Sequence, residues 1–399
     1  MEIVELPRNR AVKAKRAFTT RRVPVRDMRT LVYGNLKPAP GNLVLATVHL
    51  LGKHRRIEKL NGRRALMMPG DEIIVCYGNR YAPDQFEAVI GEDLGLCDLV
   101  AGGGIASREI NRHDRMLPPT QIMPVGLIGN ADGQPLNIAN YRIDFQEAEK
   151  TMPVILVLGT AMNSGKTFTA GSIVRGLKEN RFRVAGIKAT GTGSGGDLWK
   201  MRDMGADITL DFTDAGFSST YKSPIEEIEE GMFSLINYAA KRSCNFAVVE
   251  IADGLHHEET ATLIRSEKLR SRASGVVFAA YDSMGARSGH ELLVDLDYKV
   301  LAISGQATRS PLAIREIAGV CQCPVYTPFE IQAGSLVPTL TGETDSSTIK
   351  LINDNVCKKT SNQGHYVVDF ESQQNDLLQI RGQEDSNGFE FLDDFGISA

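Results

Sequence analysis

The sequence of 399 residues contains no apolar run long enough to cross a bilayer. Its first thirty residues are rich in Arg and Lys but contain no apolar segment typical of a secretory signal. Cysteine is sparse: the six thiols are scattered, and the close pair Cys321 and Cys323 lacks the further ligands of a zinc site. The net charge of -4 gives no general reason to expect nucleic acid as a partner. We therefore expect a cytoplasmic protein with reduced thiols and no membrane span.

Residues 31–148 have the texture of a β-rich domain. Short runs of Val, Ile and Leu are separated by Pro-Gly, Gly-Asn and Asp-Gly turn signals, which predicts a small barrel or sandwich. Residues 1–30 precede it as a basic arm. This arm could bind a polyanion such as nucleic acid, but we favour an extension packed on an acidic surface, because no known binding fold accompanies it.

Buried strand patterns alternate with amphipathic helix patterns from residue 151 to 334. The alternation predicts an α/β fold, with a mostly parallel sheet covered by helices on both faces and preceded by the smaller β-rich domain. Ligands of such sheets bind beyond the carboxyl ends of the strands. Residues 335–399 are polar and aperiodic apart from the alternating run HYVVDF at 365–370, so we expect this C-terminal segment to be partly extended or disordered.

The stretch LGTAMNSGKT, residues 158–167, follows the first strand pattern of this domain and opens a helix pattern. Gly159 and Gly165 bracket five residues instead of the four of the usual phosphate loop, or P-loop. Backbone N–H groups at such a turn point at an anion, a lysine adds charge for the β- and γ-phosphates, and a threonine hydroxyl ligates Mg²⁺. The loop residues expected to hold a nucleotide are Thr160, Asn163, Ser164, Gly165, Lys166 and Thr167.

Charged residues follow the next two strand patterns. Lys188 ends the second strand, Asp197 opens the helix after it, and Glu250 ends the third. A carboxylate at a strand end beside a P-loop is suited to Mg²⁺, and we expect Thr167, Asp197 and Glu250 to bind it. An ion-paired or helix-capping role for Glu250 is the alternative. Lys166, Lys188 and Glu250 are the expected catalytic residues.

Other polar residues of this domain carry weaker signals. Ser304 and Gly305 follow a strand at a position suited to the nucleotide base, and Arg309 and Arg315 could meet an anion there, although Arg315 is better interpreted as part of a solvated helix face. His256 and His257 follow Asp253 in a loop, where histidines serve as proton carriers or stand as plain surface residues.

The segments GTAMNSGKT, IKATG with its later Asp, and VVEIADG together resemble dethiobiotin synthetase and the related MobB-type P-loop proteins. The resemblance implies that Lys166 binds phosphate, that Lys188 meets both substrate and γ-phosphate, and that Thr167, Asp197 and Glu250 hold the metal. The stretch AAYDSMGARSGHELL resembles the segment of that family that starts a helix over the sheet. The ATGTG segment is also similar to the P-loop domain of the D-glutamate N-acetyltransferase family, whose chemistry is acyl transfer to an amino acid.

These observations predict an ATP-dependent enzyme, with GTP possible, that uses Mg²⁺. As a ligase or phosphotransferase it would activate a small carboxylate or carbamate for attack by an amine. The alternatives are an acyltransferase that acts on an amino acid and retains the fold, and a regulatory NTPase controlled by a macromolecular partner. We expect a small-molecule carboxylate or amino-acid substrate, a homodimer or other homo-oligomer, and neither nucleic acid nor membrane as a partner.

Overall fold

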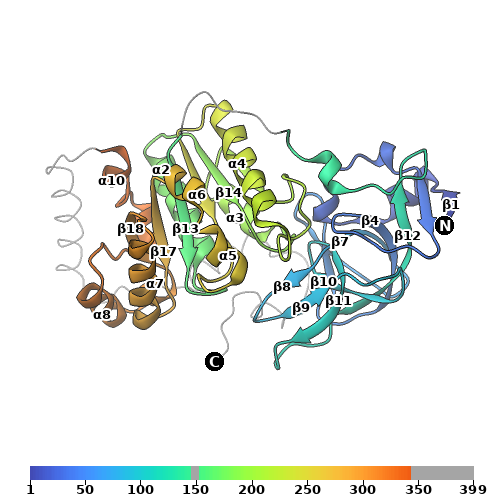
Figure 1. Ribbon diagram of the computed structural model, residues 1–399, viewed down its shortest axis with the longest axis horizontal. Helices are drawn as coiled ribbons and strands as arrows, with labels where there is room; N and C mark the ends of the chain where they lie inside the picture. The colour runs from blue at the N-terminus through green and yellow to red at the C-terminus, as the bar shows by residue number, and fades with distance from the viewer. Residues whose placement is uncertain (145–151, 343–399) are drawn as a thin grey trace, which may run out of the picture. The chain divides into compact units, whose positions relative to one another are not determined.

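The computed structural model describes residues 1–144 and 152–342. These residues form two large sheets with their helices (Figure 1). Both sheets belong to one unit, Met1–Glu343. We call residues 1–144 the β-rich region and residues 152–342 the P-loop region. The expected strand at 365–370 and the rest of the C-terminal segment beyond residue 342 lie outside the described residues.

The β-rich region contains a ten-stranded sheet in the order β1-β3-β12-β4-β7-β11-β9-β8. Because β10 pairs with both β11 and β12, the strands β12, β4, β7, β11 and β10 close into a ring. Alternate residues of these strands, such as Val44, Ala46 and Val48, point into one buried cluster, as a barrel interior requires. The strands are β1 (Glu2–Glu5), β2 (Lys15–Arg16), β3 (Thr30–Tyr33), β4 (Leu43–Leu50), β7 (Glu72–Tyr77), β8 (Arg80–Tyr81), β9 (Phe86–Val89), β10 (Cys97–Ala101), β11 (Ile105–Arg112) and β12 (Thr120–Gly129), with the separate hairpin β5 (Arg56–Glu58) and β6 (Arg64–Leu66).

Residues 1–30, expected as a basic arm, are built into this region. Strand β1 pairs with β3, β2 pairs with β7, and the short helix α1 (Arg8–Lys13) lies between them. Ala11, Val23 and Met28 are buried in its core, because apolar residues between the basic ones face the sheet. The segment is therefore part of a folded region and not a separate arm, and its basic side chains range from exposed, as for Arg26, to largely buried, as for Arg21.

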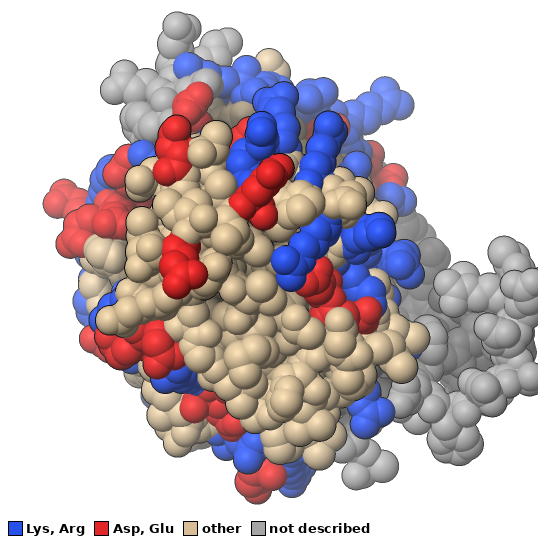
Figure 2. Space-filling view, turned by 90° about the vertical axis from the view of Figure 1, so that its right-hand side faces the viewer, with Lys and Arg blue, Asp and Glu red and all other residues tan. Residues whose placement is uncertain are grey.

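Charges of both signs cover the β-rich region. Figure 2 shows Lys and Arg side chains gathered toward one edge of the visible face, with Asp and Glu side chains between them and a largely uncharged area beside them. Some of these charges are paired: Arg10 donates to Glu72 over 2.6 Å, and Lys37 lies 2.6 Å from Glu92. Figure 2 thus shows a basic edge interrupted by acidic side chains.

The P-loop region is built on a six-stranded sheet in the order β15-β14-β16-β13-β17-β18, and all its neighbouring pairs are parallel. This confirms the predicted fold class. The sequence patterns did not predict strand β15, because its sequence ITLD is short and two of its four residues are polar. The strands are β13 (Val154–Gly159), β14 (Val184–Lys188), β15 (Ile208–Asp211), β16 (Phe246–Glu250), β17 (Gly275–Ala279) and β18 (Val300–Ser304).

Helices cover both faces of this sheet. Ile155 and Val157 of β13 pack on one face with α2, while Leu156 and Leu158 pack on the other with α4 and α7. The helices are α2 (Lys166–Glu179), α3 (Gly196–Asp203), α4 (Ile225–Lys241), α5 (Glu258–Leu263), α6 (Glu267–Arg272), α7 (Ser283–Asp295), α8 (Pro311–Val320), α9 (Pro328–Gln332) and α10 (Val337–Thr341). Among the described helices, none is both long enough and apolar enough to cross a bilayer.

A buried ion pair joins the two regions. Arg21 lies 3.0 Å from Asp211 and 2.7 Å from Asp214, and the three side chains are at most 14% exposed. Burial alone would lower the pKa of Arg21, but the two carboxylates outweigh it and raise that pKa. Asp211 at the end of β15 and Asp214 in the loop after it therefore form part of the acidic surface that was expected for the basic segment.

We expect Arg21→Ala to lower the free energy of unfolding by about 3 kcal/mol, because it leaves buried carboxylates without their partner. Arg26→Ala is the matched control, since the side chain of Arg26 is 83% exposed, and it should cost less than about 0.5 kcal/mol. Urea denaturation followed by circular dichroism measures both. Equal losses for the two variants would contradict this role of Arg21.

Candidate functional site

The loop after β13 has the backbone of an anion-binding turn. Asn163 and Gly165 have φ values of 64° and 100°, which lie in the left-handed region, and α2 begins at Lys166. The first N–H groups of a helix have no acceptor within the helix, and here they face the loop. A strand, a turn of this kind and a helix that starts with Lys-Thr make up a P-loop. The parallel sheet that carries it has the P-loop NTPase fold.

Lys166 is held inside this loop. Its ammonium donates to the carbonyl oxygens of Ala161, over 2.7 Å, and Asp253, over 2.8 Å, and the residue is 6% exposed. Burial, together with the nearby charge of Lys188, lowers the pKa of Lys166 to about 8. The lysine therefore links the P-loop with the loop that follows β16.

Two carboxylates, a lysine and a hydroxyl meet at the carboxyl ends of β14 and β16. Lys188 and Glu250 are directly paired across these strands, and the Lys188 ammonium lies 2.6 Å from Glu250 and 2.8 Å from Asp197. The Thr167 hydroxyl is 2.9 Å from a carboxylate oxygen of each acid. The structure thus brings together the four residues expected at the metal and at the reacting phosphate, and the ion pair named as the alternative for Glu250 is present as well.

The donor set suits Mg²⁺, which prefers oxygen ligands and usually takes one or two carboxylates together with phosphate oxygens. A second oxygen of Glu250 is buried without a hydrogen-bond partner, and the Lys188 ammonium already places positive charge between the two acids. No group of three His, Cys, Asp or Glu able to hold a metal occurs among the described residues. A metal held by Asp197, Glu250 and Thr167 would therefore need further oxygen ligands, such as those of a phosphate.

The charges of this cluster shift one another. Burial would lower the pKa of Lys188, but Asp197 and Glu250 outweigh it and raise the pKa. Burial would likewise raise the pKa of Asp197, yet Lys188 and the Thr167 hydroxyl hold it below its ordinary value. For Glu250, which is 1% exposed, burial prevails and raises the pKa. Each charge of the cluster thus has an opposite neighbour, which offsets part of the cost of burying it.

The other residues expected at the nucleotide take different places. Ser164 is fully buried with an unpartnered hydroxyl, and the Thr160 hydroxyl accepts from the Tyr281 N–H. A Cβ at Gly305 would lie 2.4 Å from the Ser164 carbonyl oxygen, so this glycine allows the loop after β18 to support the P-loop. The hydroxyl of Ser304 is also buried without a hydrogen-bond partner. Contact of these residues with a nucleotide stays a prediction, as it does for Arg309 and Arg315, which are both exposed.

The β-rich region reaches the site at positions that sequence reasoning missed. The Glu58 carboxylate accepts from the Gly195 N–H over 2.9 Å and from the Trp199 indole over 2.7 Å. These contacts hold the start of α3, which carries Asp197. Asn163 of the P-loop hydrogen-bonds to Asp84. No motif marked Glu58 or Asp84, because both lie in strand and turn patterns far from the P-loop in the sequence.

A cavity of about 200 Å³ lies beside the P-loop. It is lined by residues of both regions, including Tyr81, Met162, Asp253 and His257. The ring of His257 lies 4.2 Å from that of Tyr81, whereas His256 is exposed at the rim. The structure therefore places the histidine pair and Asp253 next to the expected phosphate site, although no sequence signal pointed to Tyr81.

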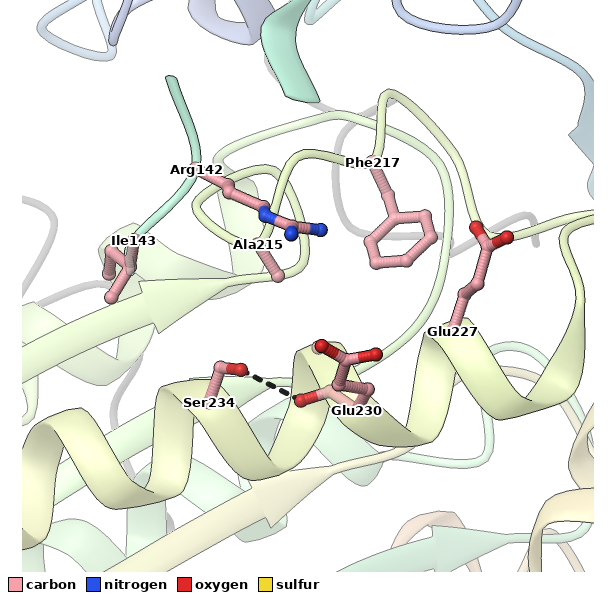
Figure 3. Close-up of a pocket in the computed structure, with 8 residues that line it drawn as sticks. Arg142, Ile143, Ala215, Phe217, Glu227, Glu230 and Ser234 are labelled. Atoms are coloured by element: carbon pink, nitrogen blue, oxygen red, sulfur yellow. Dashed lines mark hydrogen bonds between the residues drawn. The ribbon is translucent and has the colours of Figure 1, made fainter. Parts of the chain in front are cut away.

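A smaller cavity, about 70 Å³, is shown in Figure 3. It lies over α4, where Arg142 and Phe217 point toward one another and Glu227 and Glu230 stand on the helix below. The Ser234 hydroxyl donates to the Glu230 carbonyl oxygen over 2.9 Å, which leaves it little freedom to bind another group. No P-loop residue lines this cavity, so we assign the site to the P-loop.

No family model matches the chain, and no curated protein sequence matches it. Solved structures with partial similarity include the signal recognition particle receptor FtsY from Elizabethkingia anophelis, with 16% identity, a TM-score of 0.33 and coverage of 48% of this chain and 63% of that one. They also include the 54 kDa signal recognition particle protein from Aeropyrum pernix in complex with GDP, with 18% identity, a TM-score of 0.32 and coverage of 52% and 50%. The chain thus spans less than two thirds of either protein. These comparisons do not show the resemblance to dethiobiotin synthetase, which stays a prediction.

We expect Asp197→Asn and Glu250→Gln each to raise the Mg²⁺ concentration needed for nucleotide binding about tenfold or more, because each removes a charged oxygen ligand. Nucleotide binding without Mg²⁺ should change little. Asp203→Asn, at the exposed end of the same helix α3, is the control. Titration calorimetry with and without Mg²⁺ checks this, and unchanged Mg²⁺ dependence in both site variants would exclude the metal role.

We expect Glu58→Ala to weaken Mg²⁺-dependent nucleotide binding several-fold, since it frees the start of α3 without touching the P-loop. Glu58→Gln retains an acceptor oxygen and should weaken it less. Trp199 is the single tryptophan of the chain, so its fluorescence reports the lost contact directly. If Glu58→Ala shifts the emission but leaves Mg²⁺ dependence intact, Glu58 holds α3 without affecting the metal site.

Proposed function

We propose that this protein is a Mg²⁺- and nucleotide-dependent enzyme that transfers the γ-phosphoryl group of ATP or GTP to a small molecule. The observation that carries the proposal is the convergence of Lys166, Thr167, Lys188, Asp197 and Glu250 at the carboxyl ends of neighbouring parallel strands. Phosphoryl transfer depends on positioning and on charges that stabilise the moving group, and this cluster supplies both.

Each residue of the cluster has a distinct part in this proposal. The N–H groups from Asn163 to Thr167 would hold the phosphates, and Lys166 would place its charge beside the β- and γ-phosphates. Thr167, Asp197 and Glu250 would hold Mg²⁺, which when bound neutralises charge on the phosphate oxygens. Lys188 would compensate the charge of the two acids and of the transferred group.

The acceptor is less defined by this cluster. A small carboxylate or carbamate, as expected from the sequence, would need a second lysine to offset its charge near the triphosphate. Lys188 is such a lysine, but in this structure its charge is matched by Asp197 and Glu250. Support for a carboxylate acceptor therefore rests on the motif resemblance. The acyltransferase alternative also rests on a resemblance, and none of the contacts described above argues for it.

A regulatory NTPase is the second candidate, because the β-rich region touches the P-loop and the start of α3 through Asp84 and Glu58. A partner bound to that region could act on the site through these contacts. Removing residues 1–30 does not test this candidate, since that segment is part of the sheet core. Stimulation of turnover by large or by small molecules separates the two candidates.

We expect Lys166→Ala to reduce nucleotide turnover by about a hundredfold or more in a folded protein, because the side chain faces the loop and not a core. Lys241→Ala, which removes an exposed lysine at the end of α4, should behave like wild type.

Turnover of ATP and GTP is measured after addition of either the small-molecule or the large-molecule fraction of a cell extract that has been divided at about 1 kDa. Stimulation by the small-molecule fraction supports the enzyme, and stimulation only by the large fraction supports the regulatory NTPase. Full activity of Lys166→Ala would remove the P-loop assignment.

A further inference from the structure

The cavity beside the P-loop contains a carboxylate that the proposed phosphate site does not use. Asp253 lines the cavity, and its carboxylate has no hydrogen bond or ion pair within bonding distance among the described residues, although positive charges such as that of His257 lie near it. Its backbone oxygen accepts from the Lys166 ammonium, the group expected at the γ-phosphate. The backbone of Asp253 thus contacts the lysine expected at the γ-phosphate, while its side chain is left without a hydrogen bond from the described residues.

The position of Asp253 is fixed by its neighbours. It has a φ of 60°, in the left-handed region that an aspartate tolerates at some cost. The Ala252 N–H donates to the Thr190 hydroxyl over 2.8 Å, and a Cβ at Gly254 would lie 2.3 Å from the Thr160 carbonyl oxygen. The loop is therefore pressed against the P-loop on one side and tied to the loop after β14 on the other. A strained residue held in this way is typical of functional sites.

The rest of the cavity lining comes from both regions and includes the aromatic rings of Tyr81, His256 and His257, and the ring of Tyr221 lies beside that of Tyr81. Tyr81 of β8 lies 4.2 Å from His257 and 5.4 Å from Tyr221, measured between ring centroids. Nδ1 of His257 is buried without a partner. Burial lowers the pKa of His257 against the opposing charge of Asp253, which favours the neutral ring. The cavity thus combines aromatic rings, tilted against one another, with one carboxylate that has no hydrogen-bond donor among the described residues, and the β-rich region contributes Tyr81 to it.

We propose that this cavity binds the acceptor of the phosphoryl group and that the acceptor presents a hydroxyl group to Asp253. In the step, the hydroxyl O–H bond breaks and its proton passes to the Asp253 carboxylate. The hydroxyl oxygen bonds to the γ-phosphorus, and the bond from that phosphorus to the β–γ bridging oxygen breaks and leaves its electron pair on the nucleoside diphosphate. This inference rests on the proposed function and names its substrate class.

The chemistry of the cavity favours a hydroxyl over two other acceptors. A carboxylate would be repelled by Asp253 and has no proton for it to accept. An alkylammonium would form an ion pair with Asp253, which holds the proton on nitrogen and so suppresses its nucleophilicity. A hydroxyl is neutral, donates one hydrogen bond to the carboxylate and needs the proton acceptor that Asp253 provides. Burial raises the pKa of Asp253 against the opposing charges of His257, Lys166, Lys188 and Arg80, which makes it a stronger proton acceptor.

The test uses the full chain with γ-³²P-labelled ATP or GTP, Mg²⁺ and the small-molecule fraction of a cell extract. We expect a labelled product that survives neutral hydroxylamine and mild acid, as a phosphate ester does. A product cleaved by hydroxylamine is an acyl phosphate, and one cleaved by mild acid alone is a phosphoramidate. Either of these products, or label found only in free phosphate, overturns the inference.

Variants connect the product with the cavity. Asp253→Asn accepts the same left-handed backbone, and we expect it to lower transfer about a hundredfold while nucleotide binding stays within twofold. Tyr81→Ala should raise about tenfold the amount of the small-molecule fraction that is needed for a half-maximal rate of transfer. Glu258→Gln removes an exposed neighbouring charge and should leave transfer unchanged. Asp253→Asn with transfer within threefold of wild type overturns the inference, whereas failure of wild type to bind Mg²⁺ and nucleotide overturns the proposed function itself.

Discussion

Charge compensation between Lys188 and the carboxylates of Asp197 and Glu250 is the constraint on which the site depends. An isolated buried ion costs several kcal/mol, and a buried pair is tolerated only with good geometry. The parallel register supplies that geometry, because it places Lys188 directly across from Glu250 at the carboxyl ends of β14 and β16. The Thr167 hydroxyl then bridges both acids, which ties the start of α2 to the same cluster. Four separate elements, β14, β16, α2 and α3, are thus held at one point by the charges that phosphoryl transfer would use.

The β-rich region completes this arrangement from outside the parallel sheet. Its contacts reach three loops at the carboxyl edge: Arg21 pairs with the loop after β15, Glu58 holds the start of α3, and Asp84 meets Asn163 in the P-loop. Each contact is polar and involves a charged side chain of the β-rich region. Such contacts fix position more than they add stability, since much of their Coulomb energy offsets desolvation. The segments of the β-rich region that lie outside the closed ring, among them β5 with Glu58 and the turn after β8 with Asp84, are therefore best understood as supports for the loops of the site.

The P-loop region was predictable because its signals are local. The alternation of strand and helix patterns indicated the parallel sheet, and residues at the ends of β14 and β16 must lie near the P-loop in such a sheet. Lys188, Asp197 and Glu250 could therefore be selected from the sequence alone. The contribution of the β-rich region was not predictable, because Tyr81, Asp84 and Glu58 act through contacts between residues far apart in sequence. Residues 1–30 were wrongly expected to form a basic arm for a related reason. The sequence shows the density of positive charge, but the burial of Ala11 and Met28 between the charged residues depends on the sheet against which they pack.

The motifs that resemble dethiobiotin synthetase all describe how phosphate and metal are held, and they leave the acceptor undefined. The acceptor side of the cavity is formed by Asp253 and His257 after β16 and by Tyr81 of the β-rich region. Donor recognition and acceptor recognition thus lie on different segments, so similarity in the first carries no information about the second. A carboxylate acceptor inferred from the motifs must still fit a cavity whose unpaired charge is negative. Asp253 would repel such a carboxylate at contact distance, and the positive charges nearby, His257, Lys166, Lys188 and Arg80, already act on Asp253 itself.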